Sequence, residues 1–144
     1  MVFCILVRLF KWTKANACFV SKIDDEHRAI YHEADELQRS LTVAAPEFEI
    51  LEILHRLIAT TEDHLLHEEG LMRSTRYDAY DWHRQQHDTL RKRLRQFVPL
   101  IEDGDRQAAL TLIEFLSKWL KDHTALADRM LGAHLRNQDR QHAA

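Results

Sequence analysis

Histidine is unusually abundant in this chain, and several histidines fall where apolar residues are expected. The 144-residue sequence contains ten of them. The polar residues at core positions of otherwise apolar helical stripes are His27, His64, Glu68, His83, His87 and His123, and Thr61 is a further polar exception in its stripe. Without partners, each buried polar group would cost about 1–3 kcal/mol, and together they would cost about as much as a small domain's whole stability. We therefore expect one shared partner, and imidazole with carboxylate is a donor set that binds transition metals.

The spacing of these residues favours joint coordination. His64 with Glu68, and His83 with His87, are pairs four residues apart, so each pair stacks on one helix face and can serve the same ion or adjacent ions. Asp128 follows His123 by five residues. At about 100° per residue it lies about 140° around the helix from His123, so spacing alone makes it only a candidate ligand.

Four amphipathic helices are predicted to position this set, because apolar residues recur with a period near 3.6. They cover about residues 23–41, 46–74, 78–103 and 105–130. Their expected inward-facing stripes include Ile30, Leu54, Leu90 and Leu112 and, after His123, Leu126 and Met130. Pro46 is expected as a first helical residue and Asp78 and Asp105 as N-caps, while Pro99 could kink the third helix. Short connections predict an all-α fold, an antiparallel up-and-down four-helix bundle. In that topology the polar set converges on one end of the bundle.

Length and composition fit one domain with few turns. The chain has only three glycines and two prolines, which argues against turn-rich sandwiches and barrels. We expect the bundle to span residues 23–136, preceded by an extended N-terminal arm at residues 1–22 and followed by a polar tail at residues 137–144. The arm could equally result from a start codon assigned too far upstream.

Charge and the chain start exclude several partner classes. The formal net charge is −3, so no overall field favours nucleic acid or anionic lipid. The basic run Arg91–Arg95 is interpreted as a solvated helix face, and the apolar run Val2–Val7 is too short to span a membrane. Cys4 and Cys18 suit free thiols in a reducing compartment, so a cytoplasmic location is expected.

The polar set resembles the ligand set of the hemerythrin family, in particular the single-domain bacterial hemerythrins. The resemblance covers about residues 10–131 and fills all seven ligand positions with the expected residue types in order. The matching segments are Ile23–His27, His64–Met72, Tyr77–His87 and Trp119–His123, with Asp128 five residues further on.

The resemblance implies a di-iron centre with a bridging oxo or hydroxo group. It assigns His83, His87 and His123 to one iron and His27 and His64 to the other, with Glu68 and Asp128 bridging both. Two six-coordinate irons offer about twelve positions, of which these ligands fill about eleven. The resemblance implies that the vacancy, on the iron of His27 and His64, binds dioxygen reversibly as a hydroperoxide, for storage, delivery or sensing.

The expected oxygen pocket departs from the family pattern at two positions. Leu65 stands where the family usually has Phe, and Thr124 where it usually has a bulky apolar residue, whereas Trp119 and Leu120 match the pocket wall. A hydroxyl at residue 124 is expected to admit water or donate to the bound ligand and to shorten the life of the oxygenated form. These departures keep open a di-iron enzyme that reduces peroxide or nitric oxide, and the unusual arm with Cys4 and Cys18 keeps open a metal-stabilised regulatory module. The oligomeric state stays open as well.

Other polar residues are given supporting roles. One or more of Asp24, Asp63, Asp81 and Asp122 is expected to fix the orientation of the imidazoles by hydrogen bonds. His67 lies three residues after His64 and should point about 60° away from the buried stripe. It is therefore not expected to be a ligand.

Overall fold

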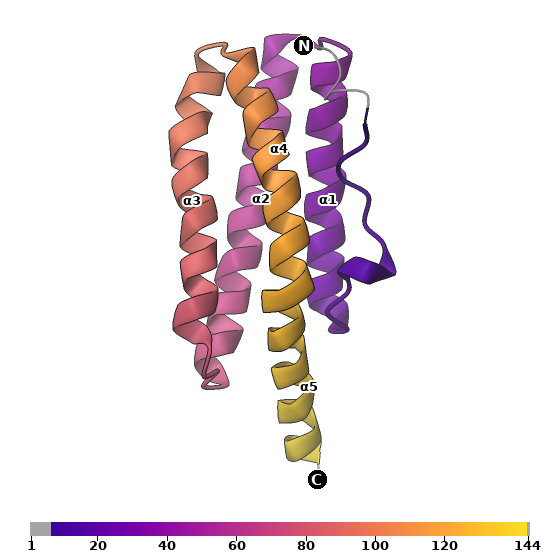
Figure 1. Ribbon diagram of the computed structural model, residues 1–144, viewed down its shortest axis with the longest axis vertical. Coiled ribbons are helices and arrows are strands. Elements are labelled where there is room, and N and C mark those ends of the chain that lie inside the picture. The colour runs from indigo at the N-terminus through magenta and orange to yellow at the C-terminus, as the bar shows by residue number, and fades with distance from the viewer. Residues whose placement is uncertain (1–6, 144) are drawn as a thin grey trace.

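The computed structural model describes residues 7–143, and within that range the chain is helical apart from short connections and an N-terminal arm. The elements are η2 (Lys14–Asn16), α1 (Ser21–Thr42), α2 (Glu47–Ser74), α3 (Tyr80–Glu102), α4 (Arg106–His123), the π-helical turn η3 (Thr124–Asp128) and α5 (Arg129–Ala143). The last three form one long rod that packs against the other helices (Figure 1). The predicted all-α four-helix bundle is confirmed.

The helix ends follow local hydrogen-bonding needs. Asp105 caps α4 as expected, because its side chain accepts a hydrogen bond from the backbone N–H of Ala108 at 3.0 Å. Gly104 before it adopts a φ of +92°, which glycine tolerates without strain. The third helix begins one residue later than expected, with Ala79 rather than Asp78 at the N-cap position.

Two apolar clusters enclose a polar layer. The larger cluster includes Ile30 of α1 and Leu65 of α2, and the smaller includes Ile23 of α1 and Met72 of α2. Along each of these helices the intervening inward-facing residue is polar: His27 in α1 and Glu68 in α2. The candidate site is thus sealed from above and below by apolar side chains.

The fourth helix changes phase at the π-helical turn, which corrects the expected stripe. In η3 the hydrogen-bonded turn spans five residues rather than four, so later side chains rotate relative to a regular α-helix. Leu126 and Met130, expected in the core, are 56% and 43% exposed. Ala127 and Leu131 are buried in their place. The helix then continues as α5 to Ala143 and projects beyond the other helices (Figure 1), so the polar tail expected from residue 137 is helical as far as residue 143.

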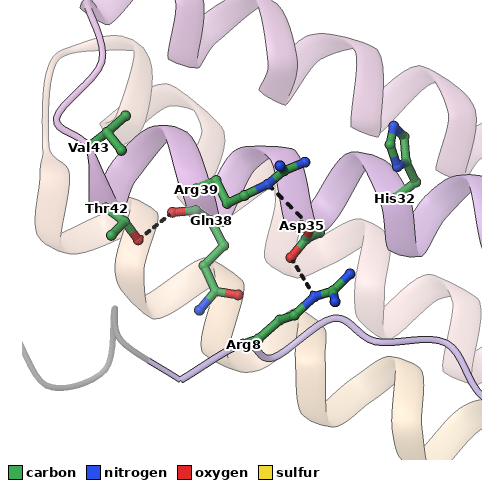
Figure 2. A pocket seen from close by; sticks show the side chains of 7 residues that line it. All are labelled: Arg8, His32, Asp35, Gln38, Arg39, Thr42 and Val43. Carbon is green, nitrogen blue, oxygen red and sulfur yellow. Dashed lines mark hydrogen bonds and ion pairs between the residues drawn. The ribbon is translucent and has the colours of Figure 1, made fainter.

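The arm lies along the bundle and is held by specific contacts. Near its start, the Arg8 side chain pairs with Asp35 of α1 at 3.2 Å (Figure 2), and the Gln38 side chain bonds the backbone of residues 7 and 9. Further on, the carboxylate of Asp24 accepts hydrogen bonds from the backbone N–H groups of Cys18 and Phe19. Cys4 and most of the run Val2–Val7 lie outside the described residues.

The second half of the arm docks on α5. Arg129 donates to the carbonyl of Ala17 at 3.1 Å, and Arg136 donates to the carbonyl of Cys18 at 2.5 Å. Gly132 lies directly beneath this crossing, where a Cβ atom would overlap the Cys18 carbonyl. The arm therefore fits only because residue 132 has no side chain.

No helix within residues 7–143 has the length and apolar character needed to cross a membrane.

Candidate metal centre

Seven buried side chains from all four bundle helices meet in the polar layer. They form two overlapping groups whose donor atoms lie within 4.8 Å of one another. The first group is Glu68, His83, His87 and His123, and the second is His27, His64, Glu68 and Asp128. All seven residues that the sequence singled out as ligands are therefore brought together.

Two carboxylates lie between the groups. Glu68 places Oε1 3.1 Å from His87 Nε2 and Oε2 3.2 Å from His64 Nε2. Asp128 places Oδ1 3.1 Å from His123 Nε2 and Oδ2 3.0 Å from His27 Nε2. Each carboxylate thus offers one oxygen to each group, which is the placement of a bridging ligand.

The π-helical turn accounts for the position of Asp128. A regular helix would leave this residue far to the side of His123, whereas the wider turn puts both on the inward face. The side chain of Asp128 is only 1% exposed. A local change in helix type therefore completes the donor set.

The donor atoms fit metal ions better than they fit one another. Within the described residues, four of these buried atoms have no aligned hydrogen-bond partner: Glu68 Oε2, both carboxylate oxygens of Asp128, and His123 Nε2. The Nε2 atoms of His27 and His64 face each other at 3.0 Å. Two ligands at right angles, each about 2.1 Å from an ion, would be about 3.0 Å apart. The donor chemistry and its spacing thus fit a pair of transition-metal ions.

Three imidazoles have their outer nitrogen fixed by an acceptor. His64 Nδ1 lies 2.7 Å from Glu26, His87 Nδ1 lies 2.8 Å from Glu69, and His123 Nδ1 lies 2.8 Å from the side-chain oxygen of Gln86. An acceptor at Nδ1 places the proton there and leaves the Nε2 lone pair facing the centre. These three imidazoles are held in the tautomer that a metal requires.

Carboxylates hold two of these imidazoles as expected, but they are not the aspartates that the sequence offered as candidates. Asp24 instead binds the arm backbone, and Asp122 pairs with Lys118 at 3.0 Å. Within the described residues, none of the four expected aspartates is among the imidazole partners found. The actual partners, Glu26, Glu69 and Gln86, each stand beside a ligand in the sequence. Adjacency alone could not select them, because Asp63 and Asp122 also stand beside ligands; the packing of the neighbouring helices decides which adjacent residue reaches an imidazole.

His67 belongs to the outer layer rather than to the donor set. Its Nδ1 atom lies 2.9 Å from Glu26 Oε2, and its side chain is 30% exposed. Neither donor group contains it. Its position agrees with the expected rotation away from the stripe.

Opposing forces set the charge of the buried imidazoles. Burial disfavours the protonated form, but hydrogen bonds and attraction from Asp128 and Glu68 outweigh it and raise the pKa of His27 and of His83 to about 9. The pKa of His64 rises to about 10 for similar reasons, with Glu26 contributing. Although burial would raise the pKa of Glu68, the surrounding histidines keep it well below its usual value. The metal-free site therefore holds protons where metal ions would otherwise lie.

A small enclosed cavity of about 10 Å³ adjoins the donors, close to the room that one water-sized molecule needs. Among its walls are Leu65, Trp119 and Leu120, and it reaches His27 and His64. Trp119 stacks on His123 with ring centroids 4.3 Å apart. The three apolar residues expected around a bound ligand thus border the space beside the second group.

The placement of Thr124 differs from the expectation. Its hydroxyl donates to the backbone carbonyl of Leu120 at 2.7 Å, and Thr124 is not among the residues that line the cavity. Thr61, one turn before His64, lines it instead. The sequence showed Thr61 only as a polar exception in an apolar stripe.

The centre is distinct from a larger depression on the surface. That depression has a volume of about 630 Å³ and lies between the arm and α1, lined by residues that include Arg8, Asp35 and Arg39 (Figure 2). None of the seven donors borders it.

The chain is similar in sequence to known proteins over most of its length. Residues 18–135 match the family model described as the hemerythrin HHE cation binding domain. The chain is 28% identical over 127 residues to bacteriohemerythrin of Aquifex aeolicus, covering 86% of this chain and 93% of that protein. It is 26% identical to bacteriohemerythrin of Clostridium acetobutylicum, covering 84% and 97%, and 25% identical to myohemerythrin of Theromyzon tessulatum, covering 79% and 83%. No solved structure matches the chain.

Proposed function

Because this chain belongs to the hemerythrin family, we propose that it holds two iron ions joined by an oxo or hydroxo bridge and binds dioxygen reversibly. The observation that carries the proposal is the buried donor set, in which two carboxylates each span both groups of histidines. His83, His87 and His123 would hold one ion, and His27 and His64 the other, with Glu68 and Asp128 shared. When bound, such a pair supplies one electron from each ion and one open position for dioxygen.

The cavity supports the choice of ligand. It borders both His27 and His64 of the second group but only His123 of the three histidines in the first, which favours an open position on the side of His27 and His64. Its volume of about 10 Å³ suits a very small molecule, and Leu65 and Leu120 keep most of its wall apolar. Apolar walls exclude bulk water, which would otherwise compete for the ion and carry protons to the ligand.

Oxygen exposure under reversible conditions tests the proposal. Iron-loaded protein is reduced without air, exposed to oxygen and then purged, while the visible absorption spectrum is followed. We expect two irons per chain and a charge-transfer band that appears with oxygen and disappears on purging. Reduced, iron-loaded protein that never forms a reversible adduct would contradict the proposal.

Thr61 favours a second candidate function, the reduction of peroxide or nitric oxide. It is the residue with a side-chain hydroxyl among those that line the small cavity, and a hydroxyl there can donate a hydrogen bond or hold a water molecule near the ligand. In that case oxygen would give only a transient band, and turnover of peroxide or nitric oxide would exceed that of free iron. A location in a reducing compartment such as the cytoplasm belongs to either proposal, since Cys18 is a free thiol.

A further inference from the structure

One of the five buried imidazoles is connected to a permanent positive charge outside the donor set. His87 Nδ1 lies 2.8 Å from Glu69 Oε2, and the same oxygen accepts a hydrogen bond from Arg91 Nη1 at 2.8 Å. The side chains of His87 and Glu69 are 0% and 4% exposed. A guanidinium therefore acts on a candidate metal ligand through a single carboxylate oxygen, away from water.

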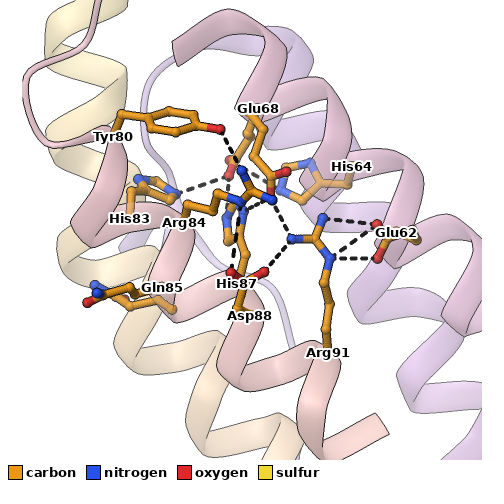
Figure 3. Close-up of polar contacts among 12 residues, drawn as sticks. Glu62, His64, Glu68, Tyr80, His83, Arg84, Gln85, His87, Asp88 and Arg91 are labelled. Carbon is orange, nitrogen blue, oxygen red and sulfur yellow. Dashed lines mark hydrogen bonds and ion pairs between the residues drawn. The ribbon is translucent and has the colours of Figure 1, made fainter. Parts of the chain in front are cut away.

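Arg91 is held firmly in this position. Glu62 of α2 accepts hydrogen bonds from Nε at 3.0 Å and from Nη2 at 2.9 Å, and Asp88 of α3 accepts one from Nη1 at 3.1 Å (Figure 3). The Arg91 side chain is only 15% exposed. Three carboxylates from two helices thus fix its planar group, which is the bidentate geometry that arginine provides and lysine does not.

The other imidazoles have different surroundings. His123 has a neutral amide at its outer nitrogen, and His64 has Glu26, which is shared with His67. Within residues 7–143, the outer nitrogens of His27 and His83 have no hydrogen-bond partner. Of the five imidazoles in the described structure, only that of His87 has an outer carboxylate that is itself paired with an arginine.

The pairing of Glu69 with Arg91 affects how strongly the His87 imidazole donates electrons to a bound metal ion. A carboxylate that accepts the Nδ1 proton makes an imidazole a stronger electron donor at Nε2, and the effect depends on how much negative charge the carboxylate keeps. Arg91 withdraws part of that charge.

We propose that Arg91 is a positioning residue that sets, through Glu69, how strongly His87 donates to the metal centre and thereby sets the centre's reduction potential. The inference rests on the proposed function only for the identity of the metal. A strong donor stabilises the ferric state. Arg91, by moderating the donor, keeps the pair easier to reduce and slower to oxidise irreversibly.

Two substitutions with opposite expected effects test the inference. Arg91→Gln removes the cation, so His87 becomes a stronger donor and the reduction potential of the iron-loaded protein falls. Glu69→Gln removes the carboxylate, so the potential rises, and metal affinity drops by about 10–100-fold. Arg91→Lys keeps the positive charge, so its reduction potential should stay close to that of the original protein. Arg84→Gln is the matched control, because Arg84 bonds Tyr80 and pairs with Asp88 on the same helix without a hydrogen bond to Glu69.

The inference is overturned if Arg91→Gln and Glu69→Gln shift the potential in the same direction, if Arg91→Gln leaves it unchanged, or if Arg84→Gln shifts it as much as Arg91→Gln. A structural role alone predicts lower stability for both variants but no opposed shifts.

Nuclear magnetic resonance of the zinc-loaded protein separates this inference from the oxygen proposal. The resonance of the His87 Nδ1 proton should move downfield in Arg91→Gln, because Glu69 becomes a better acceptor, and upfield in Glu69→Gln. These shifts in a protein whose iron form fails to bind oxygen would refute the proposed function and leave the role of Arg91 standing. An unchanged resonance in Arg91→Gln would refute that role.

Discussion

Thr124 shows how one side chain can serve a metal centre without touching it. Its hydroxyl bonds the Leu120 carbonyl at the point where α4 passes into the π-helical turn. The backbone N–H of the same residue also bonds the carbonyls of Leu120 and Lys121. Residue 124 thus helps to satisfy carbonyls where the regular helical ladder is interrupted, next to the segment that carries Asp128.

Substitutions at residue 124 should act through this turn. Thr124→Val keeps the shape but removes the hydroxyl, so we expect a loss of about 0.5–1.5 kcal/mol in the free energy of unfolding and weaker metal binding. Thr124→Ser keeps the hydroxyl and should resemble the original protein. Urea unfolding of the metal-free protein and competition with a chelator measure the two effects. A valine variant that matches the serine variant in both would contradict the role assigned to the hydroxyl.

Thr61 should affect the bound ligand instead. If its hydroxyl donates to the ligand or holds water beside it, Thr61→Val should slow the decay of the oxygenated form. The expected change is about two- to tenfold, which corresponds to one hydrogen bond of about 0.5–1.5 kcal/mol. The decay of the visible band after oxygenation provides the rate, and Thr61→Ser is the control. Equal or faster decay in the valine variant would show that the hydroxyl has no such role.

At the scale of elements, the sequence pattern predicts the buried helix faces correctly up to residue 123 and incorrectly after it. The 3.6-residue period predicted the buried faces of α1 to α4, including Ile30, Leu54, Leu90 and Leu112, because regular helices repeat their geometry. The same period failed after His123, because an apolar pattern carries no signal for a π-helical turn. It therefore placed Leu126 in the core and left Asp128 at the edge of the inward face. The ligand types and spacing were predictable, whereas the exact outer partners depend on how neighbouring helices pack.

The docking of the arm on α5 gives a test at this scale. Gly132→Ala would push a methyl group against the Cys18 carbonyl, so we expect it to destabilise the protein by about 1–3 kcal/mol. Gly70→Ala is the matched control, because a Cβ atom at this helical position in α2 meets nothing within 4 Å. That variant should be neutral or stabilising by up to about 1 kcal/mol. Thermal unfolding compares the two, and equal effects would mean that the arm does not dock closely at residue 132.

At the scale of the whole molecule, folding brings charges together that only a metal can fully satisfy. Helices α1 to α4 and the turn η3 contribute donors to one layer, which apolar clusters seal on both sides. In the metal-free protein, a proton on His83 and protons on the coupled pair His27 and His64, whose facing Nε2 atoms share one between them, offset the charge of Glu68 and Asp128. Metal ions and protons therefore compete for the same atoms.

This competition predicts opposite pH dependences. The histidine pKa values, about 6.5 when unfolded, rise to about 9–10 in the folded metal-free protein. Their contribution to stability is complete below pH 6.5 and is lost as the pH rises through 9 to 10. Metal binding displaces these protons, so the increase in melting temperature caused by bound zinc should grow between pH 6.5 and 9.5. Melting curves of metal-free and zinc-loaded protein test this, and an increase that shrinks with pH would contradict it.

A crystal structure of the iron-loaded protein, with anomalous diffraction measured at the iron absorption edge, tests directly whether the polar layer holds two iron ions. We expect two iron peaks in the polar layer, one beside His83, His87 and His123 and the other beside His27 and His64, with Glu68 and Asp128 between them. A single peak, or iron bound elsewhere on the chain, would contradict the proposed di-iron centre.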